Sequence, residues 1–298
     1  MFGVRFMDIK QLIELDRLAR EDGSRYPKKR FQFQNILQQT GKHFTGVAGP
    51  RGAGKTVILK QLAREIPDSF YLSLDTAEGN LYETIKELGE KLNVRTFLVD
   101  EIHFGRDYEE GLKKIYDFLD VRLFFTSSVS LSLFSSEYDL SRRVVIKKLY
   151  PFSFREYIWI KFETELPRLN MDTVIEKKWD RDIFSYADRF EPYLKGGNLP
   201  FSLEEPSPLH LLENIVKTVI HRDIAMIGNI PLPELEIVER LLRFVGRSEV
   251  DGINYTSLSG NLGITKYKAE QYVSLLEKAF ILLRVMPAGT SVLREPKI

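Results

Sequence analysis

The chain has 298 residues, of which 43% are hydrophobic and 29% are charged, and its formal net charge is +1. This length predicts two domains joined by a connector, and the composition is that of a globular protein without an apolar run long enough to span a membrane. So small a net charge excludes a global basic field for nucleic acid, and the absence of cysteine excludes disulfides and thiolate metal sites. The first 20 residues mix both charges with apolar residues, unlike a secretory signal, so we expect a cytoplasmic protein that does not contact a membrane.

Short apolar segments alternate with helical patterns in the first half of the chain. Between the apolar segments, residues 57–65 and 81–92 carry apolar side chains at helical spacing. Strands that alternate with helices predict an α/β fold in which helices flank a parallel sheet. The segments that are too short for helices, and are bounded by polar residues or glycine as strands are, span 44–48, 70–74, 97–99, 123–125 and 144–146.

A glycine-rich segment connects the first predicted strand to the first predicted helix. Residues 49–56 read Gly-Pro-Arg-Gly-Ala-Gly-Lys-Thr and match the phosphate-loop pattern G-x-x-x-x-G-K-[ST] in the strand-to-helix context that the pattern requires. In such a loop the backbone N–H groups surround the phosphates, the lysine reaches the β- and γ-phosphates and assists catalysis, and the hydroxyl binds Mg²⁺. The residues that we expect to bind the nucleotide are Gly49, Pro50, Arg51, Gly52, Ala53, Gly54, Lys55, Thr56 and Val57.

The third predicted strand ends in two acids, Asp100 and Glu101. A buried strand can end in this way for structural reasons alone. Behind a phosphate loop, however, the first acid is placed to hold Mg²⁺ and the second to orient and deprotonate the attacking water. We therefore predict that Thr56 and Asp100 bind the metal ion and that Glu101 is the catalytic base, which favours hydrolysis over nucleotide binding alone.

Three further positions could meet the γ-phosphate. The fourth predicted strand ends in the hydroxyl residues 126–128, with Thr126 as the predicted catalytic sensor, although a strand end or helix cap also explains them. Two arginines precede the fifth strand. We predict that Arg143 stabilises transition-state charge in the same chain or in a neighbouring one, although surface arginines are common. Asp75 ends the second strand, where a polar strand terminus is an equally good interpretation.

Several stretches together resemble a known group of proteins, the prokaryotic AAA-type ATPases. This group is related to the STAND class and joins a P-loop domain to a winged helix and usually to a nuclease-like domain of unknown function. The resemblance implies ATP as the nucleotide and a base contact for Pro200, and the chain has no Asn-Lys-x-Asp guanine motif. The stretches are residues 49–56, 71–75 (Tyr-Leu-Ser-Leu-Asp), 99–102 (Val-Asp-Glu-Ile), 149–157 (Leu-Tyr-Pro-Phe-Ser-Phe-Arg-Glu-Tyr), 193–200 (Tyr-Leu-Lys-Gly-Gly-Asn-Leu-Pro) and 221–224 (His-Arg-Asp-Ile).

The sequence pattern changes after the fifth strand and again near residue 233. We expect a P-loop AAA-type ATPase domain over 1–148, a helical lid or connector over 149–232, and a winged-helix domain over 233–298. The elements predicted for the winged helix are helices over 235–245, 256–262 and 265–279, a strand over 253–255 and a wing strand over 280–286.

Lys266, Tyr267 and Lys268 open the helix that would read duplex DNA. Residues 265–278 carry three lysines against two glutamates, so the basic patch is thin. A lid or protein-docking role for the same fold is therefore favoured over DNA binding.

The leading hypothesis is Mg²⁺-dependent ATP binding and hydrolysis that moves the winged-helix domain, as a motor or a switch. The alternative is a nucleotide-regulated DNA-binding module in which hydrolysis is incidental. The expected partners are ATP and ADP, with DNA, a protein partner or a second copy of the chain as open alternatives. Residues 293–298 resemble the start of the family's nuclease-like domain, so we expect the chain to stop before that domain and to lack nuclease activity.

Overall fold

The computed structural model describes residues 8–39, 41–75, 79–129, 140–179, 181–205, 208–248, 253–285, 296 and 298. Contacts divide these residues into two units: the first ends at His210, and the second begins at Leu211 and also includes Ser128 and Val129. Residues 149–232, which we expect to form one connector, are therefore shared between the two units. None of the described helices is both long and apolar enough to cross a membrane.

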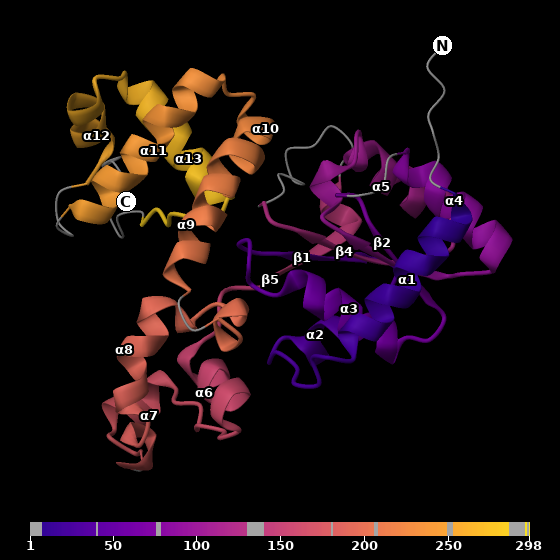
Figure 1. The fold of residues 1–298 in the computed structure, drawn as a ribbon, viewed down its shortest axis with the longest axis horizontal. Coiled ribbons are helices and arrows are strands. Elements are labelled where there is room, and N and C mark those ends of the chain that lie inside the picture. Colours follow the sequence, from indigo (N-terminus) through magenta and orange to yellow (C-terminus); the bar gives the residue numbers. More distant parts are fainter. Residues whose placement is uncertain are drawn as a thin grey trace. The chain divides into compact units, whose positions relative to one another are not determined.

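The first unit is built on one sheet of five parallel strands in the order β2-β3-β4-β1-β5 (Figure 1). All five predicted strands are confirmed, with ends that differ from the prediction by at most two residues. Every residue of β1 is buried, as expected for a central strand of a parallel sheet that is covered on both faces. The strands are β1 (Phe44–Ala48), β2 (Ser69–Ser73), β3 (Thr96–Asp100), β4 (Arg122–Ser127) and β5 (Val144–Lys148).

Helices cover both faces of this sheet. Helix α3 (Lys55–Glu65) packs on one face with α1 (Ile9–Gly23) beside it, and α4 (Leu81–Leu92) and α5 (Tyr108–Phe118) lie together on the other face (Figure 1). The apolar face of α3 is buried against β2, β3 and β4. Both helices predicted for this region are confirmed, and α4 has the predicted bounds.

Helix α1 also protects one edge of the sheet. The edge strand is β2, and the N–H of its Tyr71 donates to Asp16 Oδ1 of α1 over 2.7 Å. The guanidinium of Arg20 donates to the backbone carbonyls of Ala63 and Ser69. At Ser69 and Tyr71 of β2, side chains of α1 thus satisfy backbone groups that would otherwise be open to pairing with another strand.

After β5 the first unit continues in short helical segments. Helix α6 (Phe154–Phe162) begins with a capping box, in which the side chains of Ser153 and Glu156 each accept the other residue's backbone N–H. A small apolar cluster includes Phe152 and Tyr157. The remaining helices of this unit are α2 (Phe33–Leu37), α7 (Met171–Ile175), α8 (Phe190–Pro192), the 3₁₀ helices η1 (Ile102–Phe104), η2 (Leu140–Arg142), η3 (Arg181–Phe184), η4 (Ala187–Arg189) and η6 (Pro200–Leu203), and the π-helical turn η5 (Tyr193–Gly197).

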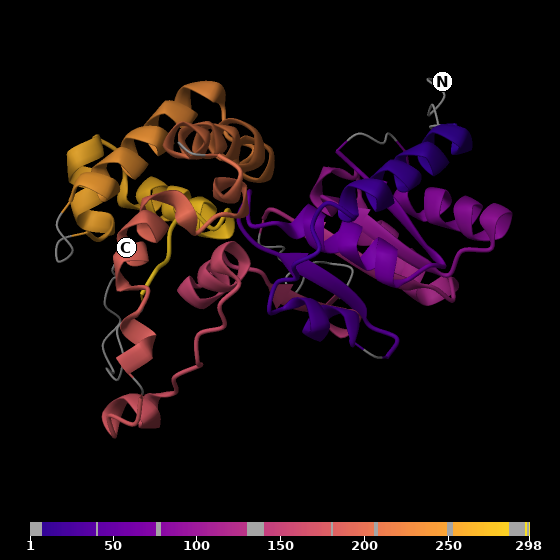
Figure 2. The same ribbon diagram turned by 60° about the horizontal axis from the view of Figure 1, so that its bottom comes forward.

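The second unit is helical (Figure 2). Its helix-turn-helix pattern is confirmed, because α12 ends at Gly263 in a left-handed conformation with φ of 66°, and the Thr265 side chain caps α13. Leu235, Leu258 and Tyr272, one from each of the last three helices, are fully buried in one core. The helices that lead into or form this unit are α9 (Leu209–Thr218), the π-helical turn η7 (Val219–Ile224), α10 (Ala225–Gly228), α11 (Leu232–Arg247), α12 (Tyr255–Leu262) and α13 (Lys266–Lys278).

The two strands predicted for this unit are wrong within the described residues. Asn254 caps α12 and shares a capping box with Ser257, so residues 253–255 start a helix where we expected a strand. Residues 280–285 contain a turn and one bridge residue, Val285, and Phe280 has a left-handed φ of 59° that interrupts an extended chain. Met286, the last residue of the predicted wing, lies outside the described residues.

Candidate nucleotide site

The glycine-rich loop runs from β1 to α3 at the carboxyl edge of the sheet. A Cβ on Gly49 would lie 1.9 Å from the backbone oxygen of Leu149, so only glycine allows the loop to start beside the end of β5. Gly54 is the N-cap of α3 and has a left-handed φ of 88°. Helix α3 therefore begins at Lys55 with its N-terminus directed at the loop, the arrangement that binds phosphate.

Lys55 crosses the loop and is only 4% exposed. Its Nζ donates to the carbonyl oxygens of Gly49 and Pro50 over 2.9 Å and 3.0 Å. Neutral carbonyls hold an ammonium group less strongly than charged phosphate oxygens do. The side chain thus lies where a triphosphate could replace these hydrogen bonds.

A cavity of about 530 Å³ opens beside the loop, within the usual size of a ligand site. Part of its wall is apolar and comes from distant segments, including Phe152 and Pro200. Pro200 approaches the loop closely, because a Cβ on Gly54 would lie 3.3 Å from Pro200 Cγ. The cavity thus joins a phosphate-binding loop to an apolar surface, as a nucleotide requires. The predicted site residues on its wall are Arg51, Gly52, Gly54, Lys55, Thr56, Val57 and Glu101.

Gln61 of α3 adds a polar group to this wall. Its Nε2 donates to the carbonyls of Tyr26 and Lys28 over 2.7 Å and 3.0 Å, which fixes the orientation of the amide. In the part of the chain that the structure describes, Gln61 Oε1 is the one buried side-chain nitrogen or oxygen without a hydrogen-bond partner. This oxygen is closed to solvent, so the contribution of Gln61 that the structure shows is the link between α3 and the carbonyls of Tyr26 and Lys28.

A second cavity, of about 600 Å³, brings the predicted metal ligands and the predicted base together. Thr56, Asp75, Asp100 and Glu101 all line it, although they come from α3 and from the ends of two strands. Arg51, Thr56 and Glu101 line both cavities. Hydroxyl and carboxylate oxygens are ligands that Mg²⁺ prefers, and this ion usually takes its other ligands from phosphate and water. The residues on this wall therefore fit Mg²⁺ bound together with a nucleotide.

Two hydroxyls hold the carboxylate of Asp100. Tyr71 donates to its Oδ2 over 2.9 Å, and Thr126 donates to its Oδ1. Burial, with the charge of Asp100, raises the pKa of Tyr71 far above its ordinary value, so the phenol stays protonated and remains a donor. Thr126 is fully buried and also accepts from the N–H of Glu101 over 2.9 Å. These contacts support a role for Thr126 in positioning the acid pair, and its contact with the γ-phosphate stays a prediction.

Glu101 follows β3 in a left-handed conformation with φ of 49°. This conformation is uncommon for a residue other than glycine, and it turns the chain into η1. The Oε2 of Glu101 lies 3.3 Å from Nδ1 of His103, which lies 3.2 Å from Oγ of Ser127. The polar ends of β3 and β4 thus meet at one imidazole beside the phosphate edge.

Arg143 lies at the amino-terminal end of the strands, opposite the end that carries the phosphate loop. Its carbonyl accepts from the N–H of Phe44, the first residue of β1, whereas the phosphate loop follows Ala48, the last residue of β1. At about 3.3 Å per residue, the five residues of β5 place roughly 16 Å between Arg143 and the phosphate edge. Its guanidinium forms an ion pair with Asp117 of α5 over 3.0 Å. This geometry is incompatible with the predicted contact of Arg143 with a nucleotide in the same chain, and a contact with a neighbouring chain stays a prediction.

Sequence analysis did not single out Tyr71, His103 or Gln61. Tyr71 stands inside β2 and reaches Asp100 because β2 and β3 pair in parallel register, with Ser73 opposite Asp100. His103 follows the acid pair closely in the sequence, which is the one signal that could have indicated it. Gln61 has no distinctive spacing from the phosphate loop, so only the fold reveals its place.

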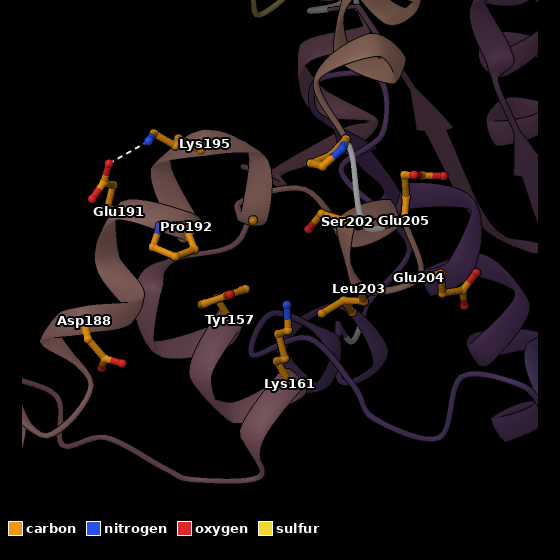
Figure 3. A pocket seen from close by; sticks show the side chains of 12 residues that line it. Tyr157, Lys161, Asp188, Glu191, Pro192, Lys195, Ser202, Leu203, Glu204 and Glu205 are labelled. Atoms are coloured by element: carbon orange, nitrogen blue, oxygen red, sulfur yellow. Dashed lines mark ion pairs between the residues drawn. The ribbon is translucent and has the colours of Figure 1, made fainter.

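A third cavity, of about 790 Å³, lies among the segments after β5 (Figure 3). Lys195 on its wall is paired with Glu191 over 2.6 Å, as the dashed line in Figure 3 shows. A wall with more acids than bases repels a triphosphate, so this cavity does not suit a nucleotide. The charged residues that line it are Lys161 and Lys195 against Asp188, Glu191, Glu204 and Glu205.

The sheet and the loop together define a class of protein. A phosphate loop follows β1, an acid pair follows β3, and β4 lies between these two strands, which is the arrangement of a P-loop nucleotide-binding domain. Residues 41–158 match the model of a family described as an AAA domain. This part of the chain therefore has the fold of a P-loop nucleotide-binding domain and is similar to AAA domains. Residues 174–297 match a family described as a domain of unknown function, DUF8612.

The chain has relatives among curated proteins. It is 27% identical to the uncharacterised protein MJ1637 of Methanocaldococcus jannaschii, over 90% of this chain and 63% of the relative. It is 24% identical to an uncharacterised protein of Haemophilus influenzae, over 84% of this chain and 64% of the relative. The chain thus spans less than two thirds of the length of these relatives.

Solved structures with a similar course of the chain include two proteins of low sequence identity. The RuvB Holliday junction branch migration motor of Thermotoga maritima is 18% identical, with a TM-score of 0.35 over 93% of this chain and 89% of that one. PCH-2 of C. elegans is 15% identical, with a TM-score of 0.32 over 92% of this chain and 70% of that one. Neither likeness is close enough to support an argument about this chain.

Proposed function

We propose that the chain binds ATP with Mg²⁺ and hydrolyses it, and that this cycle moves the helical unit that follows, as a motor or a switch. The observation that carries the proposal is that Thr56, Asp100 and Glu101 line one cavity next to the phosphate loop. A base placed beside a metal site serves turnover, because nucleotide binding alone does not require proton transfer.

Each residue of the site has a defined part in this reaction. The backbone N–H groups of residues 49–56 and the ammonium of Lys55 bind the phosphates and neutralise the charge that develops on them. Thr56 and Asp100 would hold Mg²⁺, which supplies further neutralisation of phosphate charge. Glu101 orients the attacking water and accepts its proton, while the hydroxyls bonded to Asp100 keep the acid pair in place.

Adenine is the base that we propose for the nucleotide. The resemblance to AAA-type ATPases supports it, and so does the apolar wall of the loop cavity. The chain also has no Asn-Lys-x-Asp guanine motif, which favours adenine over guanine.

The course of the chain from Pro200 to the second unit supports the proposed motion. Pro200 lies beside Gly54 of the phosphate loop, and the chain continues from Pro200 through α9 into the second unit. A change in the loop on nucleotide binding would therefore act first on the segment that leads to the second unit. This supports a mechanical link without fixing its direction.

Phosphate release from ATP tests the proposed function. We expect release that requires Mg²⁺ and stops with a chelator, and a complete lack of both ATP binding and release would reject the proposal. Because the chain has no cysteine, cysteines introduced at the exposed Lys91 and Glu270 allow a single pair of fluorescent labels. Equal energy transfer with ATP and with ADP would leave hydrolysis standing and remove the proposed motion.

A DNA-binding role of the second unit is the other candidate, and the helix-turn-helix geometry favours it. Tyr267 at the start of α13 is 77% exposed, as a base-contacting or docking residue would be. Lys268, however, forms an ion pair with Glu234 over 2.8 Å, so part of the basic patch is neutralised within the unit. We therefore rank docking to a protein above DNA binding.

The double substitution Lys266→Ala with Lys268→Ala separates these two roles. If the unit binds duplex DNA through this patch, we expect weaker binding and a salt dependence that is flatter by about two units, roughly one for each lost phosphate contact. Titration of labelled duplex at several salt concentrations measures both. No binding by the unsubstituted protein at low salt would exclude the DNA role and leave protein docking.

A further inference from the structure

Arg30 joins the phosphate loop to the segment that leaves the sheet. Its Nη1 donates to the carbonyl of Ala53 inside the loop over 2.7 Å, and its Nη2 donates to the carbonyl of Tyr150 over 2.9 Å. Its Nε and Nη2 donate to Glu156 Oε1 and Oε2 over 2.9 Å and 3.1 Å. The guanidinium carbon lies 4.7 Å from the centre of the Phe152 ring. One side chain thus connects residues that are 23 to 126 positions away from it.

The carboxylate that receives Arg30 is fixed in turn by backbone groups. The N–H of Phe31 donates to Glu156 Oε1 over 3.0 Å, and the N–H of Ser153 donates to Oε2 over 3.2 Å. Burial by itself raises the pKa of Glu156, but hydrogen bonds from Arg30 and from these N–H groups outweigh it and lower the pKa below its ordinary value. Both charged side chains are 8% exposed, so their hydrogen bonds are little screened by water. The start of α6 and residues 30–31 are therefore held in one geometry.

The bond from Arg30 to Ala53 bears directly on phosphate binding. The N–H and C=O of a peptide group point in opposite directions, so a loop that turns N–H groups toward phosphate turns carbonyls away from it. Those carbonyls need partners when they are buried, and Ala53 is fully buried. Arg30 supplies that partner for Ala53.

We propose that Arg30 is a positioning residue, which holds the phosphate loop in its binding conformation and links that conformation to the start of α6. This inference rests on the proposed nucleotide function of the loop. A guanidinium is required, because the planar group serves acceptors in several directions at once, whereas the ammonium of lysine is a single point charge on a flexible stem. Arg30 is on the wall of the loop cavity, but its guanidinium is held by Glu156 and by the carbonyls of Ala53 and Tyr150, so we assign it to positioning the loop and not to the reaction itself.

The substitution Arg30→Lys tests this inference with tripolyphosphate and Mg²⁺ as the probe, because tripolyphosphate engages the loop and not the base-binding wall. We expect the dissociation constant to rise about tenfold or more, the scale for loss of one hydrogen bond to a charged group. Calorimetric titration is done at a temperature where circular dichroism shows both proteins to be folded. A merely structural role of Arg30 would lower Tm but leave this dissociation constant unchanged.

Lys29→Met is the matched control, because Lys29 is the neighbouring cation and pairs with Glu65 at the surface, with the two side chains 34% and 43% exposed. Its dissociation constant is expected to stay within about twofold of the wild type, as surface pairs contribute little. If Arg30→Lys does not fold, the dissociation constant of Glu156→Gln for tripolyphosphate tests the inference instead. It keeps Arg30 and replaces a charged acceptor by a neutral one, so the constant should rise about threefold or more.

Wild-type affinity in whichever of these two variants folds would overturn the inference. If the wild-type protein hydrolyses ATP and the variant binds tripolyphosphate equally well, only the role of Arg30 fails. If the wild-type protein binds neither ATP nor tripolyphosphate, the proposed function fails, and this inference falls with it.

Discussion

Lys55→Ala is expected to abolish the stabilisation of the protein by Mg-ATP. A ligand that binds only the folded state, at a hundredfold excess over its dissociation constant, stabilises that state by about 2.7 kcal/mol. For a unit of this size, such a gain raises Tm by several degrees. Lys55 is buried within the loop, and we propose that its ammonium contacts the β- and γ-phosphates. Thermal unfolding with and without Mg-ATP, in both proteins, measures the effect.

Lys91→Ala is a suitable control for this experiment. Lys91 lies at the exposed end of α4, where it pairs with Glu87. It lines neither the cavity beside the phosphate loop nor the second cavity, which Asp100 and Glu101 line. This variant should show the full rise in Tm. A rise of equal size in Lys55→Ala would remove the assignment of the phosphate loop.

Glu101→Gln is expected to bind ATP nearly as well as the wild type and to lose at least about a hundredfold in turnover, the usual scale for a general base. Glutamine keeps the shape of glutamate but cannot accept the proton of the attacking water. Glu101 lines both cavities at the phosphate edge, so the water that it would activate lies beside the loop. Single-turnover phosphate release and a separate nucleotide titration distinguish the loss of chemistry from a loss of binding.

Glu110→Gln controls for the removal of a carboxylate elsewhere. Glu110 lies on α5 and pairs with Lys114 at the surface, so its loss should leave turnover unchanged. Turnover in Glu101→Gln equal to that of the wild type would show that another group is the base. His103 would then be the next residue to replace, because it lies within 3.3 Å of the Glu101 carboxylate.

The strands and the phosphate loop could be predicted because their signals are local. A buried strand of a parallel sheet is apolar along its length, and a phosphate loop needs glycines and a lysine at fixed spacing. Each of these patterns is confined to a few consecutive residues, so it can be recognised without knowledge of distant contacts. The helix-turn-helix was found for the same reason, since Gly263 and Thr265 mark the end of one helix and the start of the next.

Predictions from local patterns were wrong where the same few residues are compatible with two kinds of secondary structure. Asn254 and its neighbours have the pattern of a short strand, but a polar side chain at that position also caps a helix, and the buried Tyr255 joins the helical core. At Phe280 the chain turns through a left-handed conformation that a phenylalanine seldom adopts. Nothing in the residue type indicates that turn.

The sequence by itself was enough to predict the kind of chemistry that we propose for the site, because the phosphate loop and the acid pair each lie within one short segment. The tertiary structure alone decided which other residues take part. Parallel pairing of β5 with β1 placed Arg143 at the end of the strands that is opposite to Lys55, and pairing of β2 with β3 brought Tyr71 to Asp100. Arg30 and Glu156 meet across 126 positions in the sequence. Such contacts depend on how the whole chain folds back on itself, and no spacing along the sequence records that.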